Sequence, residues 1–436
     1  MISITWYKSD TTAMLKTGTF KTALLILLLV TAPVHYTFSQ LYYSENIADS
    51  SYFLSLNSEL AFNSNRITNS FAGAFYKREF LDNDIKTNAA ERLWADNNLL
   101  GYQFNTNLYL NIPGKKNNLN YYIGLEHRSL MELRFNRNFF QLVFFGNNVF
   151  TGDFLVLKGL SLTYLNFQQL KAGINKTWMT KKSKHVLTAG IGFNNGQNLL
   201  DYELPYGTLF TQQDAEYLNL DLNIKMQRSD TSNSKFGAEN GWGFSADLGY
   251  AYQDENNLFE FQLEDIGFIR WKKNSQRYDK DTILYFDGID MSNLLDIKGE
   301  TISGSGADSI LNAFAFSKTA NAFNQMIPMR LYLSYKRFFF KKWLSLSLSM
   351  NHYFFSLYKP QLRFVPSVNI PVKNSVISIA PLVEVGGYGR FNCGLGISAM
   401  INKKFYIEVQ TGYLNAYIRP EKSAGVGGYI SIIKTL

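Results

Sequence analysis

Residues 343–350 read Trp-Leu-Ser-Leu-Ser-Leu-Ser-Met, so that every second side chain is apolar. Leu344, Leu346 and Leu348 fall on one face of an extended chain and the serines between them fall on the other, because successive side chains of a β-strand point to opposite faces. The stretch therefore predicts a β-strand with one apolar and one polar face.

The same alternation recurs through most of the chain. Further rows of this kind lie at 104–112, 120–127, 170–178, 186–194, 217–226, 242–253, 258–264, 329–336, 361–370, 376–385, 394–401 and 405–413. Short polar segments, rich in lysine and asparagine, separate many of the rows and predict hairpin turns at 115–118, 181–184, 254–257, 341–342, 373–374 and 402–404. The sequence thus predicts an all-β protein with many antiparallel strands.

Longer segments intervene at 134–152, 227–241, 272–327 and 414–424. Short turns at one end and long loops at the other are typical of outer-membrane barrels, and aromatic side chains such as Trp178 and Trp242 cluster at row ends, where interface girdles lie. We therefore predict a transmembrane antiparallel β-barrel of about 14 strands, within a range of roughly 12 to 16. With a periplasmic C-terminus, segment 272–327 lies outside the cell, and keeping Lys181 periplasmic requires an additional strand pairing near 196–212. A soluble β-sandwich or solenoid is the alternative, but no fixed repeat period supports a solenoid.

Residues 1–39 have the pattern of a secretory signal peptide. Lys16 and Lys21 precede an apolar run at 23–30, and we expect cleavage after Ser39. The alternative, a transmembrane anchor, needs roughly 20 apolar residues, more than this run offers. Met14 is a second candidate for the start of the chain. We expect the mature protein in the outer membrane of a Gram-negative cell.

The mature chain is expected to divide into two parts. Segment 40–97 is expected to contain a short helix within 82–97, as a periplasmic or lumenal element or a packed connector, and 98–436 is expected to form the barrel. The formal net charge of +8 falls to +6 without residues 1–39, which is too dilute to indicate a nucleic-acid partner. The expected partners are outer-membrane lipid and either a small amphipathic ligand or an envelope protein, and we expect a monomer.

Two neighbouring rows resemble a known family. Gly241-Trp-Gly-Phe-Ser-Ala-Asp-Leu-Gly-Tyr250 is followed by Asp265-Ile-Gly-Phe-Ile-Arg-Trp271. This pair is similar to the strand pair of a Bacteroidetes-type outer-membrane β-barrel family of unknown function. The family is distantly similar to FadL-type long-chain fatty-acid transporters and to a barrel of the type IX secretion system, so the resemblance implies a FadL-like barrel. The residues that carry it are Gly241, Gly243, Asp247, Gly249, Tyr250, Asp265, Gly267, Ile269 and Trp271.

The sequence offers no catalytic, cofactor or metal site. His127, His185 and His352 lie on separate rows without metal-ligand spacing, and Cys393 sits within an alternating row. Aspartates near 279–290 lack the spacing of a calcium loop. We therefore do not expect an enzyme or a cofactor.

Charged side chains on the polar faces are candidates for the barrel lumen, since a charge on the lipid face costs about 2–4 kcal/mol at the bilayer midplane. These candidates are Asp221, Lys225, Asp247, Glu260, Glu264, Arg330, Lys336, Arg363, Glu384 and Glu408. Two interpretations stay open: a salt-bridge network that braces a closed barrel, or a polar conduit. Asp265 interrupts the alternation beside Gly267, which predicts a β-bulge, and by analogy with FadL-type barrels a strand kink opens a lateral exit.

Two functional hypotheses follow. The first is passive transport of a small amphipathic or hydrophobic molecule. The alternative is a non-transport barrel that docks secreted or envelope proteins, as a scaffold associated with a secretion system, through segment 272–327.

Overall fold

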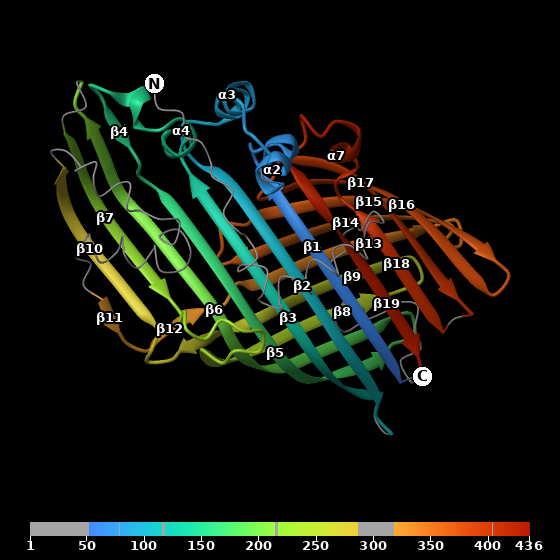
Figure 1. Ribbon diagram of the computed structural model, residues 1–436. Coiled ribbons are helices and arrows are strands. Elements are labelled where there is room, and N and C mark those ends of the chain that lie inside the picture. The colour runs from blue at the N-terminus through green and yellow to red at the C-terminus, as the bar shows by residue number, and fades with distance from the viewer. Residues whose placement is uncertain (1–51, 78, 116–117, 214–216, 287–317, 403) are drawn as a thin grey trace.

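A computed structural model describes residues 52–77, 79–115, 118–213, 217–286, 318–402 and 404–436 (Figure 1). The fold is a closed antiparallel barrel of 14 strands, as the alternation predicts. The ring closes where β1 (Phe53–Ser64) pairs with β19 (Gly425–Thr435), with Phe53 opposite Thr435. On its other side β1 pairs with β2 (Asn98–Pro113).

Eleven of the wall strands are each one continuous element, and three are built from pieces that follow one another along the same path. The further continuous strands are β3 (Leu119–Phe135), β5 (Leu160–Met179), β6 (Lys184–Thr211), β14 (Leu344–Phe354), β15 (Lys359–Val372), β16 (Ser375–Gly387), β17 (Phe391–Ile401) and β18 (Phe405–Thr411). The broken paths are β7 (Leu218–Arg228) with β8 (Gly241–Gln253), β9 (Asn257–Trp271) with β10 (Gln276–Phe286), and β11 (Lys318–Ala320) with β12 (Phe323–Met326) and β13 (Met329–Phe339). Short β4 (Phe154–Val156) pairs with the end of β6.

The breaks lie at one level of the wall. Below it β6 pairs with β8, as far as Gly196 opposite Gly241, and above it β6 pairs with β7, from Leu200 opposite Arg228. In the same way β9 pairs with β12 and β13, whereas β10 pairs with β7 and β11. Three adjacent wall strands are therefore interrupted at the same height, and the pieces on either side of the interruption pair separately.

The two ends of the barrel differ. The short connections from β2 to β3, β5 to β6, β8 to β9, β13 to β14, β15 to β16 and β17 to β18 lie at the end that holds the C-terminus (Figure 1). Helices gather at the opposite end, which is called the helical end here: α2 (Asn69–Tyr76), α3 (Asn83–Arg92), α4 (Arg137–Phe145), the 3₁₀ turn η2 (Asn147–Phe150) and α7 (Leu414–Ile418). None of the helices in the described ranges is long and apolar enough to cross a membrane.

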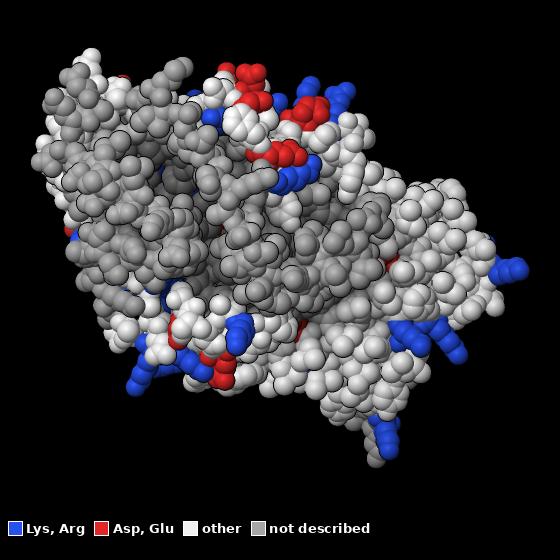
Figure 2. Space-filling model, in the orientation of Figure 1, with Lys and Arg blue, Asp and Glu red and all other residues white. Residues whose placement is uncertain are grey.

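The outer surface of the wall is apolar. Along β6, Leu187, Ile191 and Phe193 are exposed, Ile191 by 71%, whereas Thr188 and Asn194 between them are buried toward the lumen. Where Figure 2 leaves the described part of the wall in view, that surface is largely free of charge, and the charged side chains lie toward its ends. This inside-out polarity is the arrangement that lipid requires.

Aromatic side chains mark the edge of this apolar belt near the short turns. The rings of Trp178 and His185 stack with centroids 5.1 Å apart, and His185 Nδ1 lies 2.9 Å from the hydroxyl oxygen of Tyr250. About ten residues separate this level from Asn195 and Trp242 on β6 and β8, which matches the 9–11 residues a tilted strand needs to cross a bilayer.

Several expectations need correction. The barrel begins at Phe53 rather than at residue 98, because β1 is a full wall strand. The helix expected within 82–97 exists as α3 and is the packed connector among the alternatives: it lies between β1 and β2 and packs at the helical end, away from the short turns (Figure 1). No additional strand pairing near 196–212 is needed, because β6 simply runs on through that range.

The expected long loop 272–327 is partly strand. Residues 276–286 form β10, and 318–320 and 323–326 form β11 and β12. Residues 287–317 lie outside the described residues, as do residues 1–51, which include the predicted signal peptide and its cleavage position.

Candidate functional site

The conspicuous strand pair of the sequence forms an irregular joint in the wall. Between β8 and β9 the register shifts, because Ala246 pairs with Ile266 while Leu248 already pairs with Leu263. Asp265 adopts a left-handed backbone with φ of 62°, and its backbone N–H donates to Oδ1 of Asp247 at 2.8 Å. The predicted β-bulge is confirmed. It brings the carboxylate of Asp265 beside that of Asp247 inside the lumen.

Glycines allow this joint to close. A Cβ atom on Gly243 would lie 1.8 Å from the carbonyl oxygen of Phe268, and one on Gly267 would lie 2.2 Å from that of Phe244. Both obstacles are backbone atoms, which cannot rotate away. The glycines of the motif therefore let β8 and β9 approach each other beside the bulge.

Lys171, on β5, lies at the centre of the lumen cluster and is fully buried. Its Nζ lies 2.8 Å from Oδ1 of Asp265, 3.0 Å from Oδ2 of Asp247 and 3.8 Å from Oε1 of Glu126. Gln169 donates to Oδ1 of Asp265 at 2.8 Å. One ammonium group thus holds carboxylates from three different strands.

Two arginines extend the cluster. Arg128 contacts Oδ2 of Asp265 through NH1 and Oε2 of Glu126 through Nε at 3.2 Å. Arg330 contacts Oε2 of Glu264 through NH1 at 3.2 Å and donates to Asn351 at 3.0 Å. The lumen network, as we call Glu126, Arg128, Lys171, Asp247, Glu264, Asp265 and Arg330, therefore links β3, β5, β8, β9 and β13.

The network has an electrostatic consequence. Its side chains are buried or nearly so, and a charge that loses its partner in such a place keeps the full cost of dehydration. Each member is therefore held by the others. At this level the lumen is filled by side chains that are paired with one another.

A second set of contacts closes the lumen toward the helical end. Glu132 on β3 accepts hydrogen bonds from the hydroxyl of Ser356 and the backbone N–H of Leu357, in the β14–β15 turn, and from the hydroxyl of Tyr388, in the β16–β17 turn. Leu130, from β3, packs against Tyr388 and its neighbouring tyrosines. These turns fold across the lumen and contact the opposite wall.

Apolar clusters lie beyond the network toward the helical end. Trp271 and Ile327 are fully buried and pack with Ile269, Leu199 and Phe323. A larger cluster joins the wall to the helical end, and its members include Phe71, Phe140, Leu155, Leu204 and Leu222.

Most of the predicted lumen-facing side chains point inward. Those that are buried are Asp247, Glu260, Glu264, Arg330, Arg363 and Glu384. Arg363 and Glu384 form a separate ion pair, with NH2 and Oε2 3.0 Å apart. Lys336 and Glu408 are half-buried: Lys336 Nζ lies over the Phe338 ring, and Glu408 accepts from the Tyr406 hydroxyl at 2.7 Å.

Asp221 and Lys225 do not face the lumen, and for these two the expectation is wrong. On β7 it is Leu222 and Met226 that are buried, whereas Lys225 is exposed and Asp221 half-buried. The reason is that β7 lies above the apolar belt. There the inner face packs on the apolar cluster and the outer face meets water, so the polarity is reversed.

The residues of the family motif serve this architecture. Asp247 and Asp265 belong to the lumen network, Gly241, Gly243 and Gly267 permit close approach, Ile269 and Trp271 form the apolar cluster, and Tyr250 joins the aromatic edge. Gly249 faces Thr188: a Cβ atom added to Gly249 would lie 3.2 Å from the Cβ atom of Thr188.

The sequence-based candidates omit several important side chains. Glu126, Arg128, Gln169 and Lys171 complete the network, and Glu132 ties down the turns. The signal was present, because Gln169 and Lys171 alternate with the lipid-facing Leu170. Only the barrel, however, brings β3 and β5 beside β8 and β9.

The histidines do not come together. His185 belongs to the aromatic edge, while His127 and His352 lie on β3 and β14. Within the described residues no group of three or more His, Cys, Asp or Glu side chains is arranged to hold a metal ion.

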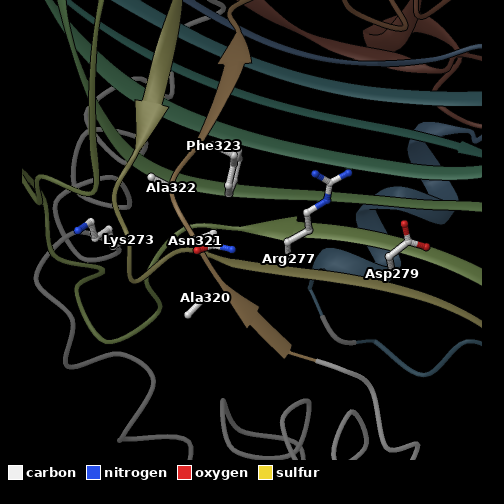
Figure 3. Close-up of a pocket in the computed structure, with 7 residues that line it drawn as sticks. All are labelled: Lys273, Arg277, Asp279, Ala320, Asn321, Ala322 and Phe323. Atoms are coloured by element: carbon white, nitrogen blue, oxygen red, sulfur yellow. The ribbon is translucent and has the colours of Figure 1, made fainter.

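A pocket of about 710 Å³ lies at the level of the strand breaks (Figure 3). Its lining combines charged Lys273, Arg277 and Asp279 with Phe323 and with Ala320, Asn321 and Ala322. Phe323 also packs against the buried cluster of Trp271 and Ile327, so one lining ring connects the pocket with the interior.

Comparisons with known proteins identify a family but supply no activity. The profile of a family described as "Family of unknown function (DUF5723)" matches residues 46–409. No curated protein matches the sequence. A solved structure titled "TodX deltaS2S3 mutant monoaromatic hydrocarbon channel" is similar at 10% identity and a TM-score of 0.44, over 93% of this chain and 96% of that chain. The transport unit of the autotransporter AIDA-I from Escherichia coli is similar at 7% identity and a TM-score of 0.29, over 96% of this chain and 98% of that chain.

Proposed function

Because the chain belongs to the family of unknown function DUF5723, as the resemblance of its motif strands indicated, its activity has to be argued from its own side chains, and we propose that it is an outer-membrane barrel for passive transport of a small amphipathic molecule. In this proposal the resting lumen is closed to ions. The molecule is first bound outside the apolar belt, in the pocket at the strand breaks.

The observation that carries the proposal is the position of that pocket. It lies where three adjacent wall strands are interrupted. The ladder of backbone hydrogen bonds between strands is therefore broken there. A wall interrupted in this way can open at lower cost than a continuous ladder. Phe323 joins the pocket to the apolar cluster around Trp271.

The lining suggests the class of molecule. Lys273 and Arg277 outnumber the single carboxylate of Asp279, and Phe323 with two alanines provides an apolar side. A small anion with a short apolar tail matches both features. A strongly ion-selective porin would need a continuous polar path through its lumen. The paired side chains of the lumen network would obstruct such a path.

The experiment uses the full-length protein in liposomes and radiolabelled octyl sulfate, which is permanently anionic and amphipathic. We expect uptake at least about fivefold above protein-free liposomes, with no matching uptake of sucrose. The double variant Lys273→Ala and Arg277→Ala should lose most of that uptake, while Lys182→Ala, in a turn at the opposite end, should retain it. Equal uptake of sucrose, or unchanged uptake by the double variant, would contradict the proposal.

A second candidate function is docking of a secreted or envelope protein. One observation favours it: Phe75 and Tyr76, in the last turn of α2, are exposed by 60% and 62%, and Phe80, which follows α2, is exposed by 86%. Exposed rings of this kind are common at protein–protein interfaces. If docking is the function, replacing Phe75, Tyr76 and Phe80 together by serine should abolish recovery of the partner from envelope extracts. Deletion of 290–320 should have the same effect. Both variants should still form a folded barrel.

A further inference from the structure

A row of polar side chains crosses the lipid-facing surface of the wall. Thr106 on β2 pairs with His127 on β3, His127 pairs with Gln168 on β5, and Gln168 pairs with Asn195 on β6. Residues that pair in register across neighbouring strands project to the same face of a sheet. The four side chains, called the polar row here, therefore form one continuous line on the outside of the barrel.

The polar row borders a field of apolar side chains. On the side of the short turns it is followed, two residues along each strand, by Leu108, Leu125, Leu170 and Phe193, all of them exposed. On the other side, Phe104 lies two residues from Thr106 on β2, and its ring centroid is 5.9 Å from that of His127. Ser129 on β3 and Asn166 on β5 lie two residues beyond the row on that side, so the row marks the edge of the apolar belt toward the helical end.

The row forms the floor of a groove of about 440 Å³. All four of its side chains line the groove, together with Leu108, Leu125, Leu170 and Phe193. The ring of Phe236, in the 229–240 segment between β7 and β8, lies 5.8 Å from the ring of His127. Phe236 is still 66% exposed, so it borders the groove without filling it.

Polar atoms on this floor lack partners. Nδ1 of His127 and Oδ1 of Asn195 are buried and make no hydrogen bond within the described part of the chain. These two positions border the apolar belt, where the neighbouring molecules are lipids, so a polar group of a lipid can supply the partner that the protein leaves out. A donor and an acceptor on the same ligand would satisfy both positions.

The charge of the groove limits the ligand. The single charged lining residue among those described is Glu126, and its carboxylate is engaged by Arg128 and Lys171 in the lumen network. The groove therefore offers no free charge to a phosphate or an ammonium group. A neutral hydroxyl or amide suits the polar row, and an acyl chain suits the leucines beside it.

From these observations we propose that the groove along Thr106, His127, Gln168 and Asn195 binds a membrane lipid whose acyl chain carries a neutral amide or hydroxyl group. The polar group lies on the row and the chain lies along Leu125, Leu170 and Phe193. The ring of Phe236 packs on one side of the bound lipid. This site is on the outer wall, and it is independent of the pocket at the strand breaks and of the transport proposed for it.

The test compares two lipids that differ in polarity but little in size. N-oleoylethanolamine carries an amide and a hydroxyl, whereas ethyl oleate carries neither donor. The full-length protein is placed in phosphatidylcholine nanodiscs that contain one or the other, and the lipid retained through repurification is quantified by mass spectrometry. We expect about a tenfold preference for N-oleoylethanolamine, which corresponds to about 1.4 kcal/mol.

Variants make the test specific. His127→Phe combined with Asn195→Leu puts apolar groups on a lipid-facing surface, so the barrel should fold, and the preference should fall to about onefold. His352→Phe is the matched control, because Nδ1 of His352 also lacks a partner within the described residues but lies on β14, outside the groove. Equal retention of the two lipids by the wild type, or an unchanged preference in the double variant, overturns the proposal. Heat-modifiable mobility on gels confirms that each variant is folded.

Discussion

Nζ of Lys171 lies 2.8 Å from Oδ1 of Asp265, and both side chains are fully buried inside the barrel. Asp265 reaches this position because of the bulge in β9, and Lys171 reaches it because it alternates with lipid-facing residues on β5. This contact joins the distinctive motif of the sequence to β5, which a single strand, β6, separates from β8 in the wall. The lumen network is built around it.

Replacing Lys171 with methionine should destabilise the barrel strongly. The substitution removes the cation that Asp265 and Asp247 share and leaves Asp265 with Arg128 alone, and breaking a buried pair in this way typically costs about 3–5 kcal/mol. Urea unfolding in detergent, followed by heat-modifiable mobility, measures the change. Lys182→Met in an exposed turn is the control and should change stability by less than about 0.5 kcal/mol.

Combining Lys171→Met with Asp265→Asn should cost less than the sum of the two single substitutions. The second change removes a carboxylate that the first deprived of one of its two cations, and contacting residues of a network couple by about 0.5–3 kcal/mol. A double-mutant cycle by urea unfolding gives this coupling energy. Additive effects would show that the two side chains do not depend on each other.

Gly243→Ala and Gly267→Ala should each prevent normal closure of the β8–β9 joint. The added methyl group would meet backbone carbonyl oxygens at 1.8 Å and 2.2 Å, so the strands must separate. The yield of heat-modifiable barrel is the measurement. Gly73→Ala on α2 is the control: its Cβ would meet nothing within 4 Å, and alanine favours a helix by about 1 kcal/mol over glycine.

Glu132→Ala should loosen the turns that close the helical end. Ser356, Leu357 and Tyr388 would lose a shared acceptor, while the ladder of the wall would stay intact. We expect new protease cleavage near 355–358 and 388–390 in a barrel that still shifts on heating. Protection equal to the wild type would mean that the turns are held by their tyrosine packing alone.

The fold could be read from the sequence to a considerable extent. Alternation predicted the strands, the short turns and the number of strands, because one face of each wall strand must be apolar in lipid. The bulge at Asp265 was predicted from an interrupted alternation. These are local signals, carried by residues close together in the chain.

Where the prediction failed, the cause was not local. Asp221 and Lys225 have the alternation of a membrane strand, yet β7 stands above the belt, where the polarity is reversed. The first strand was missed although 53–64 belongs to the ring. The contact of Lys171 with Asp265 depends on the closure and the shear of the barrel, which no single row of the sequence records.

The central claim is that the paired side chains of the lumen network close the barrel at rest. Single-channel recording in planar bilayers tests it most directly, with the wild type and a variant in which Arg128, Lys171 and Arg330 are all replaced by alanine. We predict no stable conductance for folded wild-type protein in 1 M KCl, a high-salt condition that screens weak surface charge effects, and discrete conducting events for the triple variant. A steady ohmic current through the wild type would contradict the claim.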